Sequence, residues 1–383
     1  MLISAGRVIT PARVLAPGWV LVEDRRIADV QPGSPPSRPD VDLPDATVVP
    51  GYVDAHVHGG GGASFDSADP DEALQAVSAH KAHGTTTMVG SLVTDTLEGL
   101  AGSMRALAPL VDEGHLAGLH LEGPWLSPSH AGAHDPALLT DPTREAVDAL
   151  LGAADGRLRM VTLAPELPGG LEAVRALTAA GVVAAVGHTD ATYDQTRAAL
   201  DAGASVGTHL FNAMRGLHHR EPGPVTALLE HPDAFVELIA DGVHLHPAVL
   251  RLAATRKPHL AVLVTDAMAA AASGDGDYEL GPLSVEVRGG VARLVTNGAI
   301  AGSTLTMASA VRFAVQSGGL PIEDAVRAAT TTPATMLGLD RVGALRPGYR
   351  ADLVVLDEQL DVLAVLDRGS WSEPGPESVH AAS

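Results

Sequence analysis

Residues 50–62 read PGYVDAHVHGGGG, an apolar run that ends in two histidines and then in four glycines. Residues two apart on a β-strand point to the same face, so we expect His56 and His58 to lie side by side at a strand end. The glycines that follow let the backbone pass close to a bound ligand. Histidine pairs also occur on ordinary surfaces, so the meaning of this pair depends on its partners elsewhere in the chain.

Seven further apolar segments have the length and composition of β-strands, and helical stretches rich in alanine and leucine separate most of them. Strands that alternate with helices predict a parallel sheet, and eight strands are the number that a (β/α)8 TIM-type barrel requires. The predicted strands are 48–58, 85–94, 116–122, 159–166, 182–188, 204–211, 235–243 and 260–266. The predicted helices are 68–83, 96–111, 136–154, 171–180, 192–202 and 247–256.

Both ends of the chain depart from this α/β pattern. Short strand-like segments and turn residues fill the first fifty residues, and the sequence LRPGYRADLVVLDEQLDVLAVLDRG near the other end returns to strands. We therefore expect a small β-sandwich domain built from residues 1–49 with 343–383, beside a barrel domain of residues 50–342.

Three features are predicted for the last third of the chain. Residues 270–303 have the pattern of an inserted β-hairpin, and helices are expected at 304–317 and at about 322–337. The tail after about residue 370 has a composition typical of disorder.

Histidines and acids stand at the ends of several predicted barrel strands. The carboxyl ends of barrel strands meet at one mouth, so these side chains would converge there on a metal centre that activates water. Taken singly, each has a plainer explanation as a satisfied core histidine, a loop acid or a helix cap. Taken together they favour metal binding, with Glu122 able to bridge two ions. The set is His56, His58, Glu122, His188, His209 and Asp266.

Composition narrows the classes of function and ligand. The formal charge of -21, from 46 acidic and 25 basic residues, argues against a nucleic-acid or anionic-membrane partner. The chain has no apolar run of bilayer-spanning length and no secretory signal pattern, so we expect a soluble, cytoplasmic protein. Because cysteine is absent, histidine and carboxylate must hold any metal, and zinc or iron suits such a donor set.

Segments along nearly the whole chain resemble the N-acetylglucosamine-6-phosphate deacetylase family, a branch of the amidohydrolase superfamily. HLEGPW and THLFNAM are specific to this branch, and GALRPGYRADLVVLD at 343–357 is similar to the returning β-domain strand of the superfamily. The segments are PGYVDAHVHGGGG at 50–62, HLEGPWL at 120–126, GHT at 187–189, THLFNAM at 208–214, REPG at 220–223, ADGVH at 240–244 and TDAM at 265–268.

The resemblance implies hydrolysis of N-acetylglucosamine 6-phosphate to glucosamine 6-phosphate and acetate, a step of amino-sugar metabolism. Glu122, His188 and His209 match the metal ligands that the family shares. Some members replace the histidine pair and bind one metal, so the intact pair here predicts two ions. A metal-activated hydroxide would attack, Asp266 would act as general acid and base, and His134 would contact the substrate carbonyl.

The same resemblance implies contacts to the sugar phosphate. Arg220 and His244 match phosphate ligands, and a guanidinium suits phosphate through paired hydrogen bonds. Without the resemblance, Arg220 would be taken for an ordinary loop arginine. The other predicted contacts are Asn212, Ala213, Ala133 and Ser303, of which Ser303 could instead cap the following helix.

The resemblance also implies a homodimer with the phosphate pocket near the subunit interface. Five histidines receive no role and are interpreted as loop or surface residues. They are His115, His130, His218, His219 and His246.

Two rival interpretations remain at this point. A cyclic amidase would bridge its metals with a carboxylated lysine, but Lys81 falls in a predicted helix and Lys257 precedes the last barrel strand. A non-catalytic scaffold that kept the fold should have lost ligands or the acid–base residue, and here all of them are present.

Overall fold

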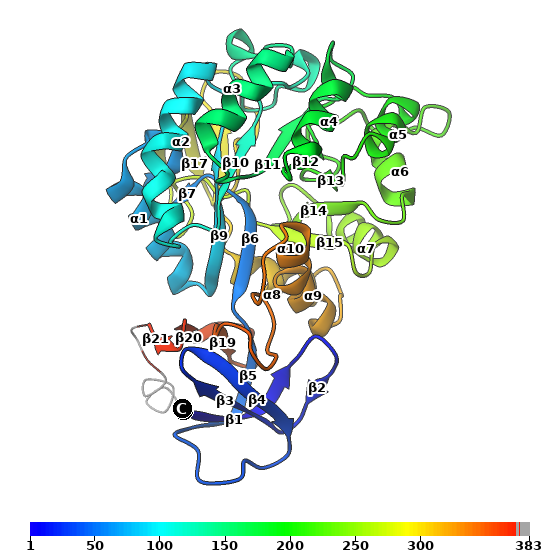
Figure 1. Ribbon diagram of the computed structural model, residues 1–383. Coiled ribbons are helices and arrows are strands. Elements are labelled where there is room, and N and C mark those ends of the chain that lie inside the picture. The colour runs from blue at the N-terminus through cyan, green and yellow to red at the C-terminus, as the bar shows by residue number, and fades with distance from the viewer. Residues whose placement is uncertain (373–374, 376–383) are drawn as a thin grey trace.

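Eight parallel strands form a single sheet in the computed structural model, which describes residues 1–372 and residue 375 (Figure 1). The sheet order is β15-β14-β13-β12-β11-β10-β9-β6, and the last and first strands meet where the Asp266 amide donates to the His56 carbonyl at 2.8 Å. This arrangement confirms the predicted barrel. The strands are β6 (Tyr52–Val57), β9 (Thr85–Leu92), β10 (Leu119–Glu122), β11 (Leu158–Leu163), β12 (Val183–Val186), β13 (Val206–Gly207), β14 (Phe235–Ile239) and β15 (Ala261–Val264).

Helices lie between the barrel strands, largely as predicted. The helix expected at 136–154 begins later, because 136–138 form only one short turn and Thr143 caps the true start. Helix α6, between β13 and β14, was not predicted. The helices are α1 (Pro70–Ala82), α2 (Leu97–Asp112), α3 (Arg144–Ala154), α4 (Gly170–Ala179), α5 (Tyr193–Asp201), α6 (Gly223–Glu230) and α7 (Pro247–Arg256).

The segment after the last barrel strand is more elaborate than the predicted hairpin. It forms a three-stranded antiparallel sheet of β16 (Gly276–Leu280), β17 (Leu283–Arg288) and β18 (Val291–Leu294). Helix α8 (Met307–Gln316) follows. The single helix expected at 322–337 is wrong: the chain forms α9 (Ile322–Ala328) and α10 (Thr331–Met336). Pro333 cannot donate to the Ala329 carbonyl, and Thr330 between the helices leaves the helical conformation.

Strands from both chain ends form the second large sheet, drawn blue and red in Figure 1. They share one apolar core that includes Ile3, Val48 and Leu353, which confirms a second, sheet-rich domain made from both ends. The sheet order is β21-β20-β19-β5-β1-β3-β4, with β2 beside β1. The strands are β1 (Leu2–Ile9), β2 (Val14–Leu15), β3 (Gly18–Glu23), β4 (Arg26–Pro32), β5 (Val41–Pro50), β19 (Leu353–Leu356), β20 (Val362–Asp367) and β21 (Ser370–Trp371).

The boundary between the two sheets is short. Gly51 alone separates β5 from β6, so the predicted strand 48–58 covers the end of one strand and the start of another. The domain limits of 1–49 with 343–383 and of 50–342 stay a prediction. The tail predicted to be disordered falls largely on residues 373–374 and 376–383, outside the described part, and Ser370 and Trp371 before it form β21.

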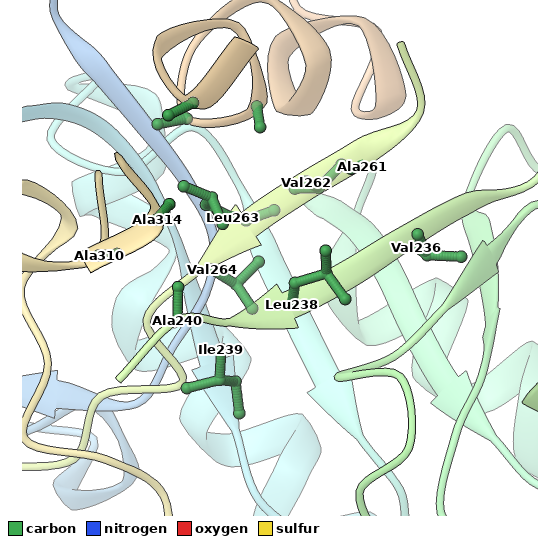
Figure 2. Packing of buried hydrophobic residues seen from close by; sticks show 14 of the residues in the cluster. Val236, Leu238, Ile239, Ala240, Ala261, Val262, Leu263, Val264, Ala310 and Ala314 are labelled. Carbon is green, nitrogen blue, oxygen red and sulfur yellow. The ribbon is translucent and has the colours of Figure 1, made fainter. Parts of the chain in front are cut away.

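Aliphatic side chains pack the outer surface of the barrel against its helices. Figure 2 shows part of this cluster, in which Ala310 and Ala314 of α8 belong with Leu263 of β15 and Leu238 of β14. The small alanine side chains allow α8 to approach the sheet closely. Within the described residues, no helix combines the length and apolar character needed to cross a membrane.

Candidate metal centre and substrate pocket

The barrel brings the predicted ligands together at the carboxyl ends of its strands. His56 lies on β6 and Glu122 ends β10, whereas His188, His209 and Asp266 each follow a strand by two residues. The φ angles of these last three residues are 47°, 26° and 49°, in the left-handed region that non-glycine residues seldom adopt. Such turns aim the side chains back over the mouth of the barrel.

Glu122 lies at the centre of this cluster and faces two groups of histidines. Its Oε1 atom lies 3.1 Å from Nε2 of His188 and 2.9 Å from Nε2 of His209. Its Oε2 atom lies 3.5 Å from Nε2 of His56 and 3.2 Å from Nε2 of His58. The carboxylate therefore has one oxygen directed to each group, which is the geometry expected of a bridging ligand.

The spacing of the donor atoms fits divalent metal ions. A tetrahedral zinc ion with bonds of about 2.0–2.1 Å holds neighbouring ligand atoms about 3.3–3.4 Å apart. The Nε2 atoms of His56 and His58 are 3.1 Å apart, as are those of His188 and His209. Oδ1 of Asp266 lies 3.4 Å from each Nε2 of the first pair. Two donor groups that share Glu122 are thus spaced as the ligands of two ions.

Hydrogen bonds at the opposite ring nitrogen hold two of these histidines. Nδ1 of His56 lies 3.2 Å from Oε2 of Glu237, and Nδ1 of His188 lies 2.8 Å from the carbonyl oxygen of His130. Both contacts place a proton on Nδ1 and leave Nε2 free to bind a metal. Nδ1 of His58 and of His209 has no hydrogen-bond partner among the described residues.

The electrostatics of the cluster also favour a cation. Burial by itself would raise the pKa of Glu122, but the charge of His56 and hydrogen bonds from other histidines hold this pKa well below its usual value. Asp266 behaves in the same way: burial opposes ionisation, and His56 and His58 keep its pKa low. Two buried carboxylates thus remain ionised among histidines, an arrangement that metal ions stabilise.

His134 adds a hydrogen-bond donor to the same cluster. The backbone amide of Thr94 donates to its Nδ1 at 3.3 Å, so the neutral ring carries its proton on Nε2. That Nε2 atom lies 3.4 Å from Oε2 of Glu122 and faces the cavity above the metal centre. The ring is therefore oriented to donate to an oxygen that develops negative charge there.

A cavity of about 390 Å³ opens above the metal centre. Besides His134 and five of the six residues of the predicted metal set, its walls include Asn212, Ala213, Ala133 and His244. Arg220 is exposed and does not line this cavity. Ser303 does not line it either; its hydroxyl donates to the Thr265 carbonyl at 2.6 Å and accepts from the Leu305 amide, as expected of a turn residue.

Buried Glu237 and half-buried His130 support the site but were not predicted. Oε2 of Glu237 contacts His56 and also accepts from the His209 amide at 3.2 Å, so it connects the two donor groups. His130, interpreted from sequence as a loop or surface histidine, lines the cavity. Its side chain contacts Asp190 at 3.2 Å. Glu237 lies within a strand of apolar residues, and that position was its only signal in the sequence.

A chain of side-chain hydrogen bonds lies beneath His56. His120 contacts the Ser91 hydroxyl and the Thr162 hydroxyl, each at 2.9 Å, and Thr162 contacts Thr208 at 2.9 Å. Burial lowers the pKa of His120 well below its usual value, so the ring is neutral. Its ring meets that of His56 edge-on, with centroids 4.6 Å apart. This polar layer fixes the floor of the candidate metal centre.

Comparison with known proteins agrees with this geometry. The model of the amidohydrolase family matches residues 47–372.

The chain belongs to the amidohydrolase family.

Relatives of this amidohydrolase include deacetylases of amino-sugar phosphates. It is 41% identical over 360 residues to N-acetylgalactosamine-6-phosphate deacetylase of Escherichia coli, covering 92% of this chain and 95% of that one. It is 37% identical to N-acetylglucosamine-6-phosphate deacetylase of Vibrio furnissii, covering 84% and 82%. The solved structure of an aspartate-to-alanine mutant of N-acetyl-D-glucosamine-6-phosphate deacetylase from Mycobacterium smegmatis, in complex with N-acetyl-D-glucosamine 6-phosphate, is 51% identical. It superposes with a TM-score of 0.95 and covers 97% and 98% of the two chains.

Proposed function

We propose that this amidohydrolase removes the acetyl group from N-acetyl-D-glucosamine 6-phosphate, giving D-glucosamine 6-phosphate and acetate in amino-sugar metabolism. The observation that carries the proposal is the position of Glu122, with one oxygen toward His188 and His209 and the other toward His56 and His58. The resemblance to the Mycobacterium smegmatis complex supports the substrate.

Different residues would bind the metal, transfer the proton and stabilise the oxyanion. His56, His58, Glu122, His188 and His209 would hold one or two divalent ions, zinc or iron. Such an ion lowers the pKa of bound water toward neutrality and polarises the acetamide carbonyl. Asp266 would take a proton at Oδ1 and deliver it to the leaving amine, and Nε2–H of His134 would stabilise the developing oxyanion.

The phosphate requires a cation that the cavity lacks in a single chain. Of the lining residues, none is arginine or lysine, and His244, whose Nδ1 contacts Asp241 at 2.6 Å, is the wall residue predicted to bind phosphate. Arg220 is exposed on the loop before α6. We propose that Arg220 reaches the phosphate from a second copy of the chain in a cytoplasmic homodimer. Asn212, Ala213 and Ala133, which line the cavity, would complete the surroundings of the sugar, whereas Ser303 lies outside the lining.

The lysines argue against a carboxylated-lysine centre. Nζ of Lys81 pairs with Asp367 at 2.7 Å, and Nζ of Lys257 donates to the carbonyls of His231 and Ala234. Neither lysine lines the cavity at the mouth of the barrel. The cyclic-amidase interpretation therefore lacks its bridging group.

A second candidate substrate is N-acetylgalactosamine 6-phosphate, because a relative of that specificity is 41% identical. The test is acetate release from both epimers and from unphosphorylated N-acetylglucosamine, with and without a chelator. We expect chelator-sensitive release that requires the phosphate and is fastest with the glucosamine epimer. Faster turnover of the galactosamine epimer would reassign the substrate, and release that a chelator leaves unchanged would refute the metal centre.

A further inference from the structure

A second cavity, of about 520 Å³, lies at the opposite end of the barrel from the metal centre. Arg350, one of its walls, contacts the carbonyl of Thr86 at the start of β9, whereas the metal ligands lie at the carboxyl ends of the strands. The cavity is lined by Asp24, Arg25, Arg26, Asp340, Arg341, Val342, Arg350 and Arg368. We call these residues the arginine pocket.

The arginine pocket gathers positive charge, whereas the protein as a whole is negatively charged. Five of the 25 basic residues converge on it, in a chain whose formal charge is -21. Within the part of the chain that the structure describes, Arg25 and Arg26 form no ion pair, while Arg350 pairs with the buried Asp352. Arg341 and Arg368 also pair with aspartates, Asp340 and Asp367, so among the described residues of the pocket the positive charge that remains unpaired is that of Arg25 and Arg26.

The arginines are held in place by hydrogen bonds between the segments that carry them. Nε of Arg25 donates to the Arg368 carbonyl at 3.2 Å. The Arg350 amide donates to the Arg341 carbonyl at 2.9 Å, and Nη1 of Arg26 donates to the Gly348 carbonyl at 2.9 Å. A ligand that bound here would therefore order few additional groups, which lowers the entropic cost of binding.

The backbone conformations at three of these arginines are unfavourable for arginine. The φ angles of Arg25, Arg341 and Arg368 are 63°, 56° and 51°, in the left-handed region where glycine and asparagine are preferred. A side chain other than glycine pays roughly 1–2 kcal/mol in this region. Arg25 and Arg368 take this conformation in the two-residue turns that join β3 to β4 and β20 to β21, so the turns fix where these arginines lie.

We propose that the arginine pocket binds a small anion that carries two phosphate groups. Guanidinium groups pair with phosphate oxygens through two parallel hydrogen bonds, and Arg25 and Arg26, which form no ion pair among the described residues, supply one guanidinium for each of two such groups. Val342 is the one apolar side chain in the lining, so the pocket offers no platform for a nucleobase and selects a compact bisphosphate. This ligand is distinct from the substrate and does not depend on the proposed deacetylation.

The test uses the complete, metal-loaded protein and D-fructose 1,6-bisphosphate as the probe. Isothermal titration is carried out at about 0.15 M salt, which screens weak surface attraction. Saturating glucosamine 6-phosphate is present to occupy the metal-centre cavity. We expect one saturable site per chain, and inorganic phosphate should bind at least about tenfold more weakly, since it fills only half of the donors.

Two variants separate ligand binding from folding. Arg25→Asn and Arg341→Asn place a residue that tolerates the left-handed conformation, so both should fold and melt at or above the parent temperature. Each should lower the affinity for the bisphosphate about tenfold or more, while kcat and KM for deacetylation stay unchanged. Arg13→Ala, at an exposed arginine outside the pocket, is the matched control and should bind normally.

Three results would overturn the proposal. Binding that disappears when glucosamine 6-phosphate is added would belong to the metal-centre cavity. Affinity unchanged in both asparagine variants would remove the arginines from the site. Titration curves that do not saturate and that weaken equally in Arg13→Ala would show general attraction of anions.

Discussion

Oδ1 of Asp266 lies 3.4 Å from Nε2 of His58, and that same nitrogen lies 3.2 Å from Oε2 of Glu122. The aspartate therefore shares a histidine with the bridging carboxylate instead of standing apart from it. An ion held by His58 would lie within reach of Asp266, and so would a water molecule bound to that ion. This proximity is what a general base for water activation requires.

Replacement of Asp266 tests that role directly. We expect Asp266→Asn to keep its metal, because the histidines and Glu122 remain, and to lose about 10²–10⁴-fold in kcat, the usual contribution of a general acid–base group. Metal content by elemental analysis and steady-state kinetics are the two measurements. A variant that turns over normally would exclude Asp266 from proton transfer.

Glu122→Gln should affect both donor groups together. The neutral amide offers a single oxygen and no charge, so it cannot serve two ions as the carboxylate does. We expect the metal content per chain to fall by half or more and acetate release to be lost. Glu230→Gln, at an exposed glutamate on α6, is the control and should retain both. Full metal content in Glu122→Gln would contradict the bridging role.

Arg220→Ala should raise KM for the sugar phosphate by roughly tenfold or more, since a charge-assisted hydrogen bond is lost, with little change in kcat. Arg13→Ala, at an exposed arginine that does not line the cavity, is its control. An unchanged KM in Arg220→Ala would show that Arg220 does not bind the phosphate of the substrate.

Mixed dimers test whether Arg220 acts across a subunit interface. Because Arg220→Ala alone keeps its kcat, the readout is KM. Co-expression of Arg220→Ala with Asp266→Asn chains should give sites with the KM of the parent protein, because one site of the mixed dimer then combines an intact Asp266 with an intact Arg220 from the other chain. Arg220 acting within its own chain predicts no such recovery. Size-exclusion chromatography with light scattering would establish the dimer independently.

The buried side chain of His80 should make the protein less stable in acid. Burial lowers the pKa of His80 to about 4, while its Nε2 contacts the Gly59 carbonyl at 2.8 Å. The unfolded chain binds this proton near pH 6.5 and the folded chain near pH 4, so the free energy of unfolding should fall as pH drops through that window. The loss should be at most about 3 kcal/mol.

His80→Gln should remove this part of the pH dependence. Urea unfolding at pH 7 and at pH 4.5 would measure the difference for each protein. The variant should be less stable at pH 7, because packing changes, and should lose less on acidification. An identical acid-induced loss in the two proteins would show that other groups, such as the histidines of the candidate metal centre, account for all of it.

The sequence was sufficient for the elements whose signal is local. Each barrel strand is an apolar run bounded by turn residues, so all eight could be located from the order of residues alone. Helix α6 was missed because its eight residues, GPVTALLE, are too short to show a helical repeat. The break between α9 and α10 falls just before Pro333, which has no amide hydrogen to donate to the Ala329 carbonyl, so the sequence did carry a signal for it.

Prediction of the site had a different limit. Histidines and acids at strand ends are recognisable because all carboxyl ends of a parallel barrel meet at one mouth. Glu237 and His120 lie inside strand segments, where sequence does not show which partner a polar side chain meets in the barrel interior. Arg220 lies outside the cavity of its own chain because of the path that the loop before α6 takes. The sequence of that loop does not specify this path.

The left-handed turns at His188, His209 and Asp266 place backbone preference and ligand chemistry in direct conflict. Glycine would relax each turn, yet glycine has no side chain to bind a metal or to move a proton. A substitution that stabilises the backbone at these positions would therefore remove a functional side chain. Stabilising substitutions, such as consensus residues or prolines, should be made elsewhere in the chain. A more thermostable variant of this enzyme would have to gain its stability in the outer helices and the second sheet. It would keep the three strained residues at the mouth of the barrel.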